Sequence, residues 1–323
     1  MRAVVCRQLG PLDTLVIEDQ EPPVPGDGQV VVDLRAAGVN FVDGLICQGS
    51  YQLKPATPFV PGSEIAGEVS ALGTGVNGVE VGDRVIAFVG FGGFAEQAVV
   101  PALSLIPVPD TIDFTRAAAL IQSYSTMLFT LTRRTHLEPG EWVLVLGAGG
   151  GIGLAATDVA RALGGRVIAA ASSPEKLEAA RAMGAEAVIA YEEEDLKTRA
   201  REIAGGGVDL VVDPVGGRHS EAALRATRHF GRFCVLGFAS GPIASIPLNQ
   251  VLLNNRTVIG VDWGGWTFKD PLGNRALIDE LMGMVGSGRL HPVQPAPYPL
   301  EAAAEVMGGL IDRSIAGKAV LVP

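Results

Sequence analysis

One stretch of the chain decides the fold: Trp142-Val-Leu-Val-Leu-Gly-Ala-Gly-Gly-Gly-Ile-Gly-Leu-Ala-Ala156. A short apolar run ends at five glycines spread over residues 147–153, and the small residues of a helix follow. This pattern predicts a buried strand that turns tightly into a helix whose first amide groups are uncovered. Such a helix start binds phosphate, because free N–H groups and the positive end of the helix dipole meet there.

The spacing of small residues in this turn matches the dinucleotide-binding fingerprint, with Ala148 in place of the first glycine. We expect Gly150 to let the backbone approach a pyrophosphate and Gly153 to let the helix pack closely on the strand. Gly151 and Ile152 lie between them and complete the predicted cofactor-binding turn. A glycine-rich turn with a purely structural role is the alternative.

Strand and helix patterns alternate after the glycine turn. We predict strands at 166–171, 187–190, 209–213 and 232–236, and helices at 174–183, 193–204 and 218–228. Short apolar strands that alternate with helices are typical of a parallel sheet covered on both faces. The predicted fold class is therefore α/β, with a Rossmann-type doubly wound parallel sheet.

The first part of the chain follows a different pattern. Strands predicted at 30–37, 64–72 and 84–88 are separated by glycine-rich turns, which is typical of a partly closed β-barrel. After residue 255 the alternation stops, and a helix at 275–286 and a strand at 317–322 follow; we expect that strand to return to the first domain. The sequence thus predicts a nucleotide domain, 119–262, inserted into a barrel domain, 1–118 with 263–323, and a site in the cleft between them.

Composition limits the classes of function. The 323 residues are 48% hydrophobic and carry a net charge of −10, which fits a well-buried α/β protein and argues against a nucleic-acid surface. The most apolar stretch is too short and too rich in glycine to cross a bilayer, so we expect no membrane partner. Cys6, Cys47 and Cys234 form neither a disulfide framework nor a metal cluster. With no secretion signal at the start, we predict a cytoplasmic location.

Two further motifs are more specific than the glycine turn: Gly38-Val-Asn-Phe-Val-Asp-Gly-Leu-Ile-Cys-Gln-Gly-Ser-Tyr51 and Pro61-Gly-Ser-Glu-Ile-Ala-Gly67. With them, essentially the whole chain resembles the medium-chain dehydrogenase/reductase superfamily. Within it, the chain resembles the zinc-independent quinone oxidoreductase family, also called zeta-crystallin-like. The resemblance implies a GroES-like β-barrel domain for the substrate and an inserted Rossmann domain for NADP.

Zinc-dependent members of this superfamily hold a catalytic zinc with a Cys, a His and a second Cys or an equivalent residue. At the matching positions this chain has Asn40, Ser63 and Gln122. Glu64 is present, but one carboxylate cannot assemble the three-ligand site of a catalytic zinc. The four-cysteine lobe of a structural zinc is also missing, and the four histidines lack ligand spacing. We therefore predict no metal.

The end of the second predicted strand favours NADPH over NADH. NAD sites usually place Asp or Glu there to bind the ribose, whereas this chain has Ala171-Ser-Ser-Pro-Glu-Lys176. Two hydroxyls and an ammonium would attract a 2′-phosphate that a carboxylate would repel. The resemblance implies that Ser172 and Lys176 contact this phosphate and that Tyr191 and Arg313 close over it.

The resemblance also implies residues for the nicotinamide half of the cofactor. Val215 and Phe238 would flank the nicotinamide or its ribose, as in relatives. Thr126 would hydrogen-bond the carboxamide or a cofactor phosphate, with helix packing as the alternative. Asp213, at the end of a predicted strand, is interpreted as a cap of the turn that follows it.

Hydride transfer from NADPH leaves the protein to position the acceptor and to stabilise the charge that grows on its oxygen. Asn40 through its amide and Tyr51 through its hydroxyl are the candidate catalytic donors, with packing of Tyr51 on the cofactor as the alternative. Asp43 is a candidate for orienting a neighbour or relaying a proton, or else it is a structural turn carboxylate. Trp263 is a candidate for the acceptor pocket, and Trp266 for core packing.

The leading hypothesis is an NADPH-dependent reductase that transfers hydride to a quinone without zinc. A reductase of the carbon–carbon double bond of enals, enones or enoyl thioesters is the first alternative. An NADPH-binding protein with a structural or regulatory role is the second. We expect a small quinone or conjugated carbonyl as substrate and, by analogy, a homodimer formed at the edge of the nucleotide sheet.

Overall fold

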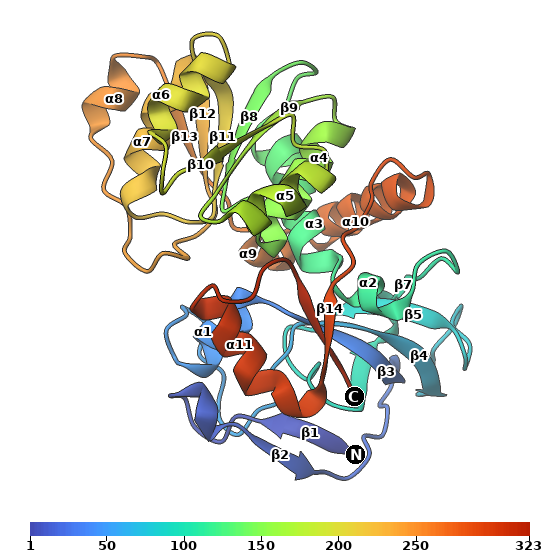
Figure 1. Cartoon of the computed structure of the whole chain (residues 1–323). Coiled ribbons are helices and arrows are strands. Elements are labelled where there is room, and N and C mark those ends of the chain that lie inside the picture. Colours follow the sequence, from blue (N-terminus) through green and yellow to red (C-terminus); the bar gives the residue numbers. More distant parts are fainter. The chain divides into compact units, whose positions relative to one another are not determined.

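The computed structural model describes residues 1–323, and the chain divides into two compact units (Figure 1). Unit 1 consists of Met1–Gln122 and Gln294–Pro323, and unit 2 of Ser123–Val293. A domain inserted into another is therefore present, as the sequence predicts. The inserted unit extends to Val293, however, instead of ending at residue 262.

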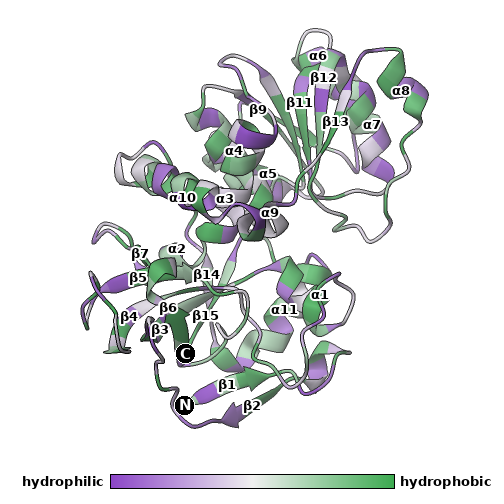
Figure 2. Cartoon of the chain, turned by 180° about the vertical axis from the view of Figure 1, so that it is seen from behind, coloured by the Kyte–Doolittle hydropathy of each residue, from purple (hydrophilic) through white to green (hydrophobic).

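Unit 2 is built on a parallel six-stranded sheet with the order β10-β9-β8-β11-β12-β13. The central strands β8 and β11 are almost wholly buried, because helices cover both faces of a doubly wound sheet. Apolar residues, green in Figure 2, run along β11. The strands are β8 (Trp142–Leu146), β9 (Arg166–Ala171), β10 (Ala187–Ala190), β11 (Val208–Asp213), β12 (Thr227–Val235) and β13 (Thr257–Gly260).

The helices of unit 2 begin at local capping residues. Ser173 caps α5 and Pro174 is its first residue, as its sequence predicts. Asp195 caps α6 by accepting the N–H of Thr198 at 2.7 Å, so this helix begins at Leu196, later than the predicted 193. The helices are α3 (Ile121–Phe129), the π-helical η3 (Thr130–Arg134), α4 (Gly151–Ala162), α5 (Pro174–Ala182), α6 (Leu196–Ile203), α7 (Arg218–Ala226), α8 (Leu248–Leu252), α9 (Trp263–Lys269) and α10 (Pro271–Gly286).

Helices α9 and α10 belong to unit 2 because their side chains pack on its other helices. The Trp266 ring of α9 stacks on Phe129 of α3, with ring centroids 4.6 Å apart. Glu280 of α10 forms an ion pair with Arg133 at 2.7 Å, and Leu281 is fully buried. These contacts move the domain boundary beyond the residue expected from the end of the strand–helix alternation.

Unit 1 is a mainly antiparallel β-structure in which one long strand, β3, pairs with several others, while β14 and β15 pair in parallel. β6 pairs with the first half of β3 and β15 with its last residues, while β4 pairs along the opposite edge. The strands are β1 (Arg2–Val5), β2 (Val16–Asp19), β3 (Gln29–Val39), β4 (Glu64–Leu72), β5 (Arg84–Phe88), β6 (Gln97–Pro101), β7 (Ile106–Pro107), β14 (Ala296–Pro299) and β15 (Ala319–Val322).

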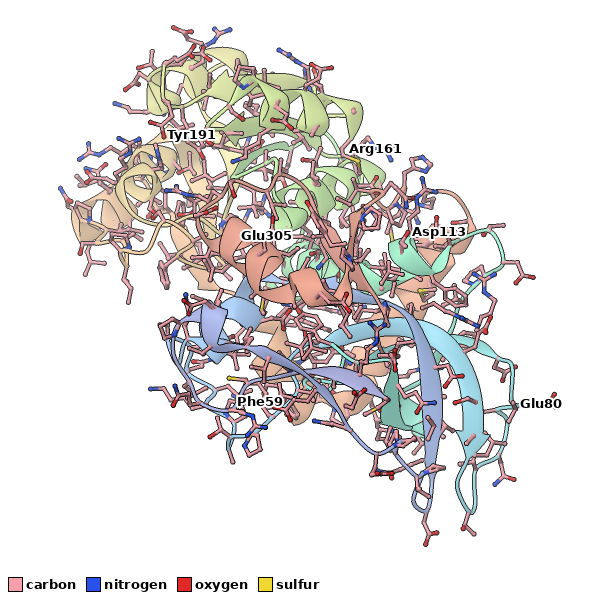
Figure 3. All side chains as sticks on the ribbon, turned by 60° about the horizontal axis from the view of Figure 1, so that its bottom comes forward. Phe59, Glu80, Asp113, Arg161, Tyr191 and Glu305 are labelled. Carbon is pink, nitrogen blue, oxygen red and sulfur yellow. The ribbon has the colours of Figure 1, made fainter.

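Short helices complete unit 1. Asp113 caps α2 by accepting the N–H of Arg116 at 2.9 Å (Figure 3). None of the helices in either unit combines the length and apolar character that a membrane span requires. The helices are η1 (Leu12–Thr14), α1 (Phe41–Cys47), η2 (Ala102–Ser104), α2 (Phe114–Ala118), η4 (Leu300–Ala302) and α11 (Ala303–Ile311). The C-terminal strand β15 returns to β3, so the predicted return of the tail is confirmed.

Candidate functional site

The glycine turn lies directly after β8, where the strand order of unit 2 reverses between β8 and β11. Open α/β sheets bind ligands at such a switch point, outside the carboxyl ends of the strands. Gly147 adopts a left-handed φ of +60°, and helix α4 begins four residues later at Gly151. The N–H groups of Gly151, Ile152 and Gly153 lie in the first turn of α4 and have no acceptor within that helix.

The two fingerprint glycines of this turn have different surroundings. A Cβ atom at Gly153 would lie 2.3 Å from the carbonyl oxygen of Gly147, so only glycine allows this close packing of helix on strand. A Cβ at Gly150 would meet nothing nearer than 3.6 Å. Gly150 therefore borders open space, into which the amides of the first turn of α4 can bind an anion.

Lys176 packs its side chain against the glycine turn. A Cβ at Gly149 would lie 2.4 Å from the Cβ of Lys176, which shows how closely the two backbones approach. Ser173 accepts the Lys176 N–H at 3.4 Å as the cap of α5, and Ser172 is exposed just before it. The structure thus brings Lys176 beside the glycine turn, and Ser172 lies just before the helix that carries Lys176. Their predicted contact with a 2′-phosphate remains a prediction.

Tyr191, labelled in Figure 3, follows β10 and packs against a histidine that the sequence analysis did not include in the site. The Tyr191 and His219 ring centroids are 4.3 Å apart, with the rings tilted by 39°. Glu192 hydrogen-bonds Arg218 next to them and lies 3.8 Å from His219. His219 stands 28 positions after Tyr191 in the sequence, so no local pattern predicted this contact.

The turn after β11 is held by Asp213. Its Oδ1 accepts the N–H groups of Val215 and Gly216 at 2.9 and 2.8 Å, and its Oδ2 accepts the Ser220 hydroxyl at 2.6 Å. The predicted capping role of Asp213 is confirmed. A Cβ at Gly216 would lie 2.8 Å from the Phe238 ring, so the structure brings Val215 and Phe238 together at the ends of β11 and β12.

Three other predicted site residues have no described contact that assigns them to a cofactor. Thr126 is half-buried on α3 of unit 2, where its carbonyl accepts the Thr130 hydroxyl at 2.6 Å. Tyr51 and Arg313 belong to unit 1, and Arg313 adopts a left-handed φ of +68° just after α11. Their predicted contacts with a cofactor remain predictions.

The two indoles of α9 both pack against other helices of unit 2. Trp263 is buried and donates its Nε1–H to Asn274 at 3.1 Å, so it is a packing residue. Trp266 packs on Phe129, as expected, and also lines a pocket of about 470 Å³ at the carboxyl ends of β12 and β13. Phe129, Phe238, Arg134 and Lys269 also line this pocket, and Asp262 adds one carboxylate.

On unit 1, the N-terminus of α1 carries two of the predicted catalytic residues. Asn40 caps this helix, and Asp43 accepts its backbone N–H at 2.8 Å. Both side chains are buried. Burial raises the pKa of Asp43 to about 7, although the Asn40 N–H and the Lys318 ammonium lower it.

Asn40, Glu64 and Lys318 form a buried polar cluster. The Lys318 ammonium lies 2.6 Å from Oε1 of Glu64 and donates to Oδ1 of Asn40, while Nδ2 of Asn40 donates to Glu64 at 3.0 Å. The other Glu64 oxygen accepts the backbone N–H of Gln122 at 2.9 Å, and Ser63 donates to the Gln122 side chain at 2.9 Å. The sequence analysis did not identify Lys318.

This cluster does not fit a zinc ion. Two amides, one hydroxyl and one carboxylate replace the thiolates and imidazole that zinc prefers, and the Lys318 cation is already paired with that carboxylate. No three His, Cys, Asp or Glu side chains of the chain gather into a metal-binding group. No step of the reaction is therefore assigned to a metal.

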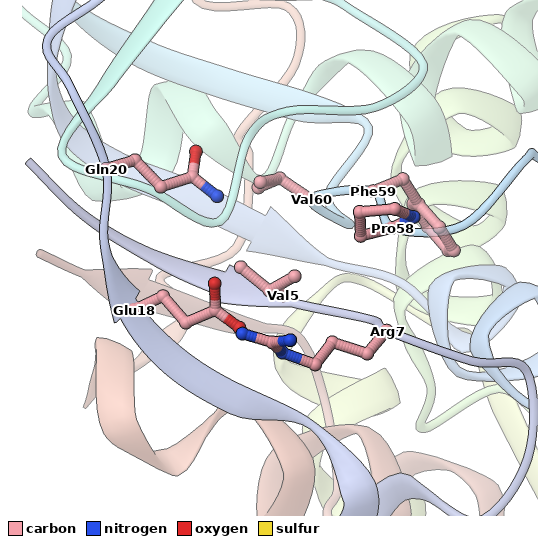
Figure 4. A pocket seen from close by; sticks show the side chains of 7 residues that line it. All are labelled: Val5, Arg7, Glu18, Gln20, Pro58, Phe59 and Val60. Atoms are coloured by element: carbon pink, nitrogen blue, oxygen red, sulfur yellow. The ribbon is translucent and has the colours of Figure 1, made fainter.

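A second pocket, of about 400 Å³, lies in unit 1 and contains none of the predicted site residues (Figure 4). Arg7 and Glu18 on its wall pair with each other at 2.6 Å. Its lining is Val5, Arg7, Glu18, Gln20, Pro58, Phe59 and Val60. Since both charges are matched within the wall, we do not place the active site there.

The doubly wound sheet with its glycine turn, joined to a β-structure of the GroES-like type, defines the medium-chain dehydrogenase/reductase superfamily. The family model "Alcohol dehydrogenase GroES-like domain" matches residues 26–110, and the model "Zinc-binding dehydrogenase" matches residues 151–276. The second match lies wholly in unit 2. It therefore does not include Asn40, Ser63 or Gln122, the positions that match zinc ligands.

Known proteins place the chain more closely. "Quinone oxidoreductase-like protein 2" of Bos taurus is 39% identical over 99% of this chain and 92% of the relative. The crystal structure of the Escherichia coli quinone oxidoreductase complexed with NADPH superposes with a TM-score of 0.90 at 29% identity, over all of both chains. The Thermus thermophilus quinone oxidoreductase, also solved with NADPH, gives 0.84 at 34% identity and the same coverage. The chain belongs to the quinone oxidoreductase family of this superfamily and is one of its oxidoreductases.

Proposed function

We propose that this protein reduces a quinone with NADPH and uses no metal ion. The observation that carries the proposal is the phosphate-binding turn at Gly147–Gly153 with Lys176 packed against it. A cation fixed beside a helix N-terminus provides for a dinucleotide that carries an additional phosphate. The NADPH held by two solved relatives and the names of the relatives support the proposal.

In this proposal, different residues of unit 2 bind different parts of the cofactor. The amides of Gly151, Ile152 and Gly153 bind the pyrophosphate, which Gly150 leaves room to approach. Ser172 and Lys176 bind the 2′-phosphate, and Val215 and Phe238 flank the nicotinamide end. Tyr191, Arg313 and Thr126 keep the roles expected from the resemblance. When bound, NADPH supplies the hydride.

The residues of unit 1 stabilise the acceptor oxygen. Asn40 uses one of its two side-chain N–H groups on Glu64, which leaves the other for the oxygen on which negative charge grows. Tyr51 is the second donor. We assign Asp43 to holding the N-terminus of α1, since its carboxylate accepts the Asn40 backbone N–H. The aromatic anion of a reduced quinone is stable enough to take its proton from water.

A panel of acceptors tests this function. Purified protein is given NADPH or NADH with a benzoquinone, a 2-alkenal, an enoyl thioester or a simple alcohol, with and without a chelator. We expect rapid quinone-dependent oxidation of NADPH that chelator does not change. Turnover of only the alkenal or thioester would move the assignment to the double-bond reductases. Cofactor binding without any turnover would favour a structural or regulatory role.

One observation favours an enoyl thioester as the second candidate substrate. Phosphates of a thioester carrier need cations at the site, and Arg134 and Lys269 line the pocket at the ends of β12 and β13. Arg134 is partly engaged, because its Nε donates to the carbonyl of Gly260 at 3.0 Å. Charge reversal of Lys269 would lower thioester turnover and leave benzoquinone turnover unchanged if this candidate is right.

We also propose a homodimer formed through β13, which is the edge strand of the nucleotide sheet. Val258 on that strand is 42% exposed, and Phe230 on the neighbouring strand β12 is 69% exposed. An edge strand with exposed apolar side chains can pair with another chain, which buries those side chains. A second copy of this chain supplies such a partner by isologous pairing. The cytoplasmic location expected from the sequence stays a prediction.

A further inference from the structure

A buried cation lies at the predicted acceptor site of unit 1. The Lys318 side chain is 4% exposed and its partner Glu64 is 1% exposed. Lys318 comes just before β15, Glu64 begins β4, and Asn40 follows β3, and both β4 and β15 pair with the end of β3. Three neighbouring strand ends therefore bring the ammonium, the carboxylate and the amide together.

The hydrogen bonds of the pair determine how the Asn40 amide is turned. An ammonium has donors only and an ionised carboxylate has acceptors only. Lys318 can therefore face only the amide oxygen of Asn40, and Glu64 can face only its nitrogen. If the amide were rotated by a half turn, its NH2 group would face the Lys318 ammonium and its oxygen would face the Glu64 carboxylate. Two donors would then meet on one side and two acceptors on the other.

An ion pair as deeply buried as this one contributes little net stability over an apolar pair of the same shape, because both charges must be desolvated. A fixed amide is nevertheless useful in catalysis. An amide turned the wrong way would present its oxygen to the oxygen of the acceptor, where negative charge grows, and would repel it. A preorganised donor needs no rearrangement during the reaction.

We propose that Lys318 is a positioning residue, which with Glu64 holds the Asn40 amide with its free N–H toward the acceptor oxygen. The inference rests on the proposed function and adds to it. In this chain the lysine ammonium supplies the fixed positive charge among the side chains that match the zinc ligands of other superfamily members. Lys318 acts through Asn40, since its ammonium is already engaged by the Glu64 carboxylate and the Asn40 oxygen.

Substitution of the pair by neutral side chains of similar size tests the proposal. The double variant Lys318→Met with Glu64→Gln leaves no unpaired charge, and a glutamine satisfies the Asn40 amide in either orientation. We expect kcat for the acceptor that the wild type reduces to fall at least about tenfold, while the Kd for NADPH stays unchanged. Lys197→Met, an exposed lysine of α6, is the matched control and should change neither value.

The same variants in a background that lacks the amide separate positioning from a general structural role. Asn40→Ala alone should lower kcat about 100-fold, as expected for the loss of an oxyanion donor. Adding the Lys318→Met and Glu64→Gln changes to it should lower kcat no further, because their effect passes through Asn40. Losses that multiply, or a kcat of the double variant within twofold of the wild type, would overturn the proposal.

A measurement without turnover keeps the test independent of the proposed function. The chain has six asparagines, so asparagine-selective ¹⁵N labelling gives six pairs of side-chain amide signals, and the Asn40 pair is the one missing from Asn40→Ala. In the wild type, one Asn40 proton should exchange slowly with water and the other rapidly. If both exchange rapidly, the amide is not fixed and the proposal fails. If the wild type reduces no acceptor, the proposed function fails, while this signal still decides the orientation.

Discussion

Among single residues, Lys176 is the side chain that we expect to distinguish NADPH from NADH. Its Cβ and Cγ pack against Gly149 in the glycine turn, and in the proposed complex its ammonium binds the 2′-phosphate. A hydrogen bond to a charged group contributes about 1.5–3 kcal/mol. Lys176→Ala should therefore weaken NADPH binding about tenfold to 100-fold and leave NADH binding nearly unchanged, as measured by fluorescence titration. Equal losses for both cofactors would remove Lys176 from the phosphate site.

Asp43 should make the stability of the protein depend on pH. Its pKa is raised to about 7 by burial, although the Lys318 ammonium nearby lowers it and the Glu64 carboxylate raises it further. Between about pH 4 and pH 7 the folded chain keeps a proton that the unfolded chain has lost. The free energy of unfolding therefore falls as pH rises through this window, and the contribution present below about pH 4 is absent above pH 7.

Asp43→Asn should flatten this dependence, because the amide does not titrate and its oxygen still accepts the Asn40 N–H. Each pKa unit corresponds to about 1.4 kcal/mol, so the two proteins should differ by a few kcal/mol in their change between pH 4.5 and pH 8. Urea unfolding at several pH values measures it. Asp27→Asn, at an exposed turn of unit 1, is the control. Parallel curves for wild type and Asp43→Asn would contradict the assignment.

Among the elements, the glycine turn requires that helix α4 begin very close to the end of β8. Gly153→Ala would push a methyl group against the Gly147 carbonyl, 2.3 Å away, and should destabilise unit 2 by about 1–3 kcal/mol. NADPH binding should weaken as well, since the first turn of α4 moves. A Cβ atom added at Gly283 in α10 would have no neighbouring atom within 4 Å. Gly283→Ala should therefore be neutral or stabilise the protein by about 1 kcal/mol or less. Thermal unfolding compares the two, and similar shifts would argue against the packing explanation.

Elements whose signals are local were predictable from the sequence. The bounds of β9, β10 and α5 follow from apolar runs, a Ser-Pro start and a terminal glycine, all within a few residues. The start of α6 was predicted three residues early, because Asp195 caps the helix and not a residue before 193. The partners of the two α9 indoles were not predictable in this way, because Trp263 donates to Asn274 of α10 and Trp266 stacks on Phe129 of α3.

The parts of the site that were missed depend on contacts between distant residues. Lys318 is 278 positions from Asn40 and 254 from Glu64, and the sequence around it predicts only the start of a strand. Cys6 and Cys47 likewise seemed unrelated, yet their thiols contact each other, and burial raises both pKa values. All three cysteines are free and buried, which makes them poor nucleophiles. Only the pairing of β15 with β3 brings the tail to the site.

At the scale of the whole molecule, the edge of the nucleotide sheet is the surface from which we expect assembly. β13 pairs only with β12, and the backbone N–H of Phe230 bonds the carbonyl of Asn254 at 3.0 Å, which ties this exposed phenyl ring to the segment after α8. Leu252, the last residue of α8, and Leu253, which follows it, are also exposed. All these exposed apolar residues belong to unit 2.

Val258→Lys should therefore convert a dimer into a monomer, because a lysine on an edge strand blocks pairing between sheets and places like charges opposite each other across a two-fold axis. Sedimentation equilibrium measures the mass, expected to be twice the chain mass of 33.5 kDa for the wild type and equal to it for the variant. Val24→Lys, which replaces an exposed valine of unit 1, is the control and should remain dimeric. NADPH affinity should be retained in both variants, since neither position touches the glycine turn or Lys176. A wild type that sediments as a monomer, or a Val258→Lys protein that still pairs, would show that the edge of the sheet is not the interface.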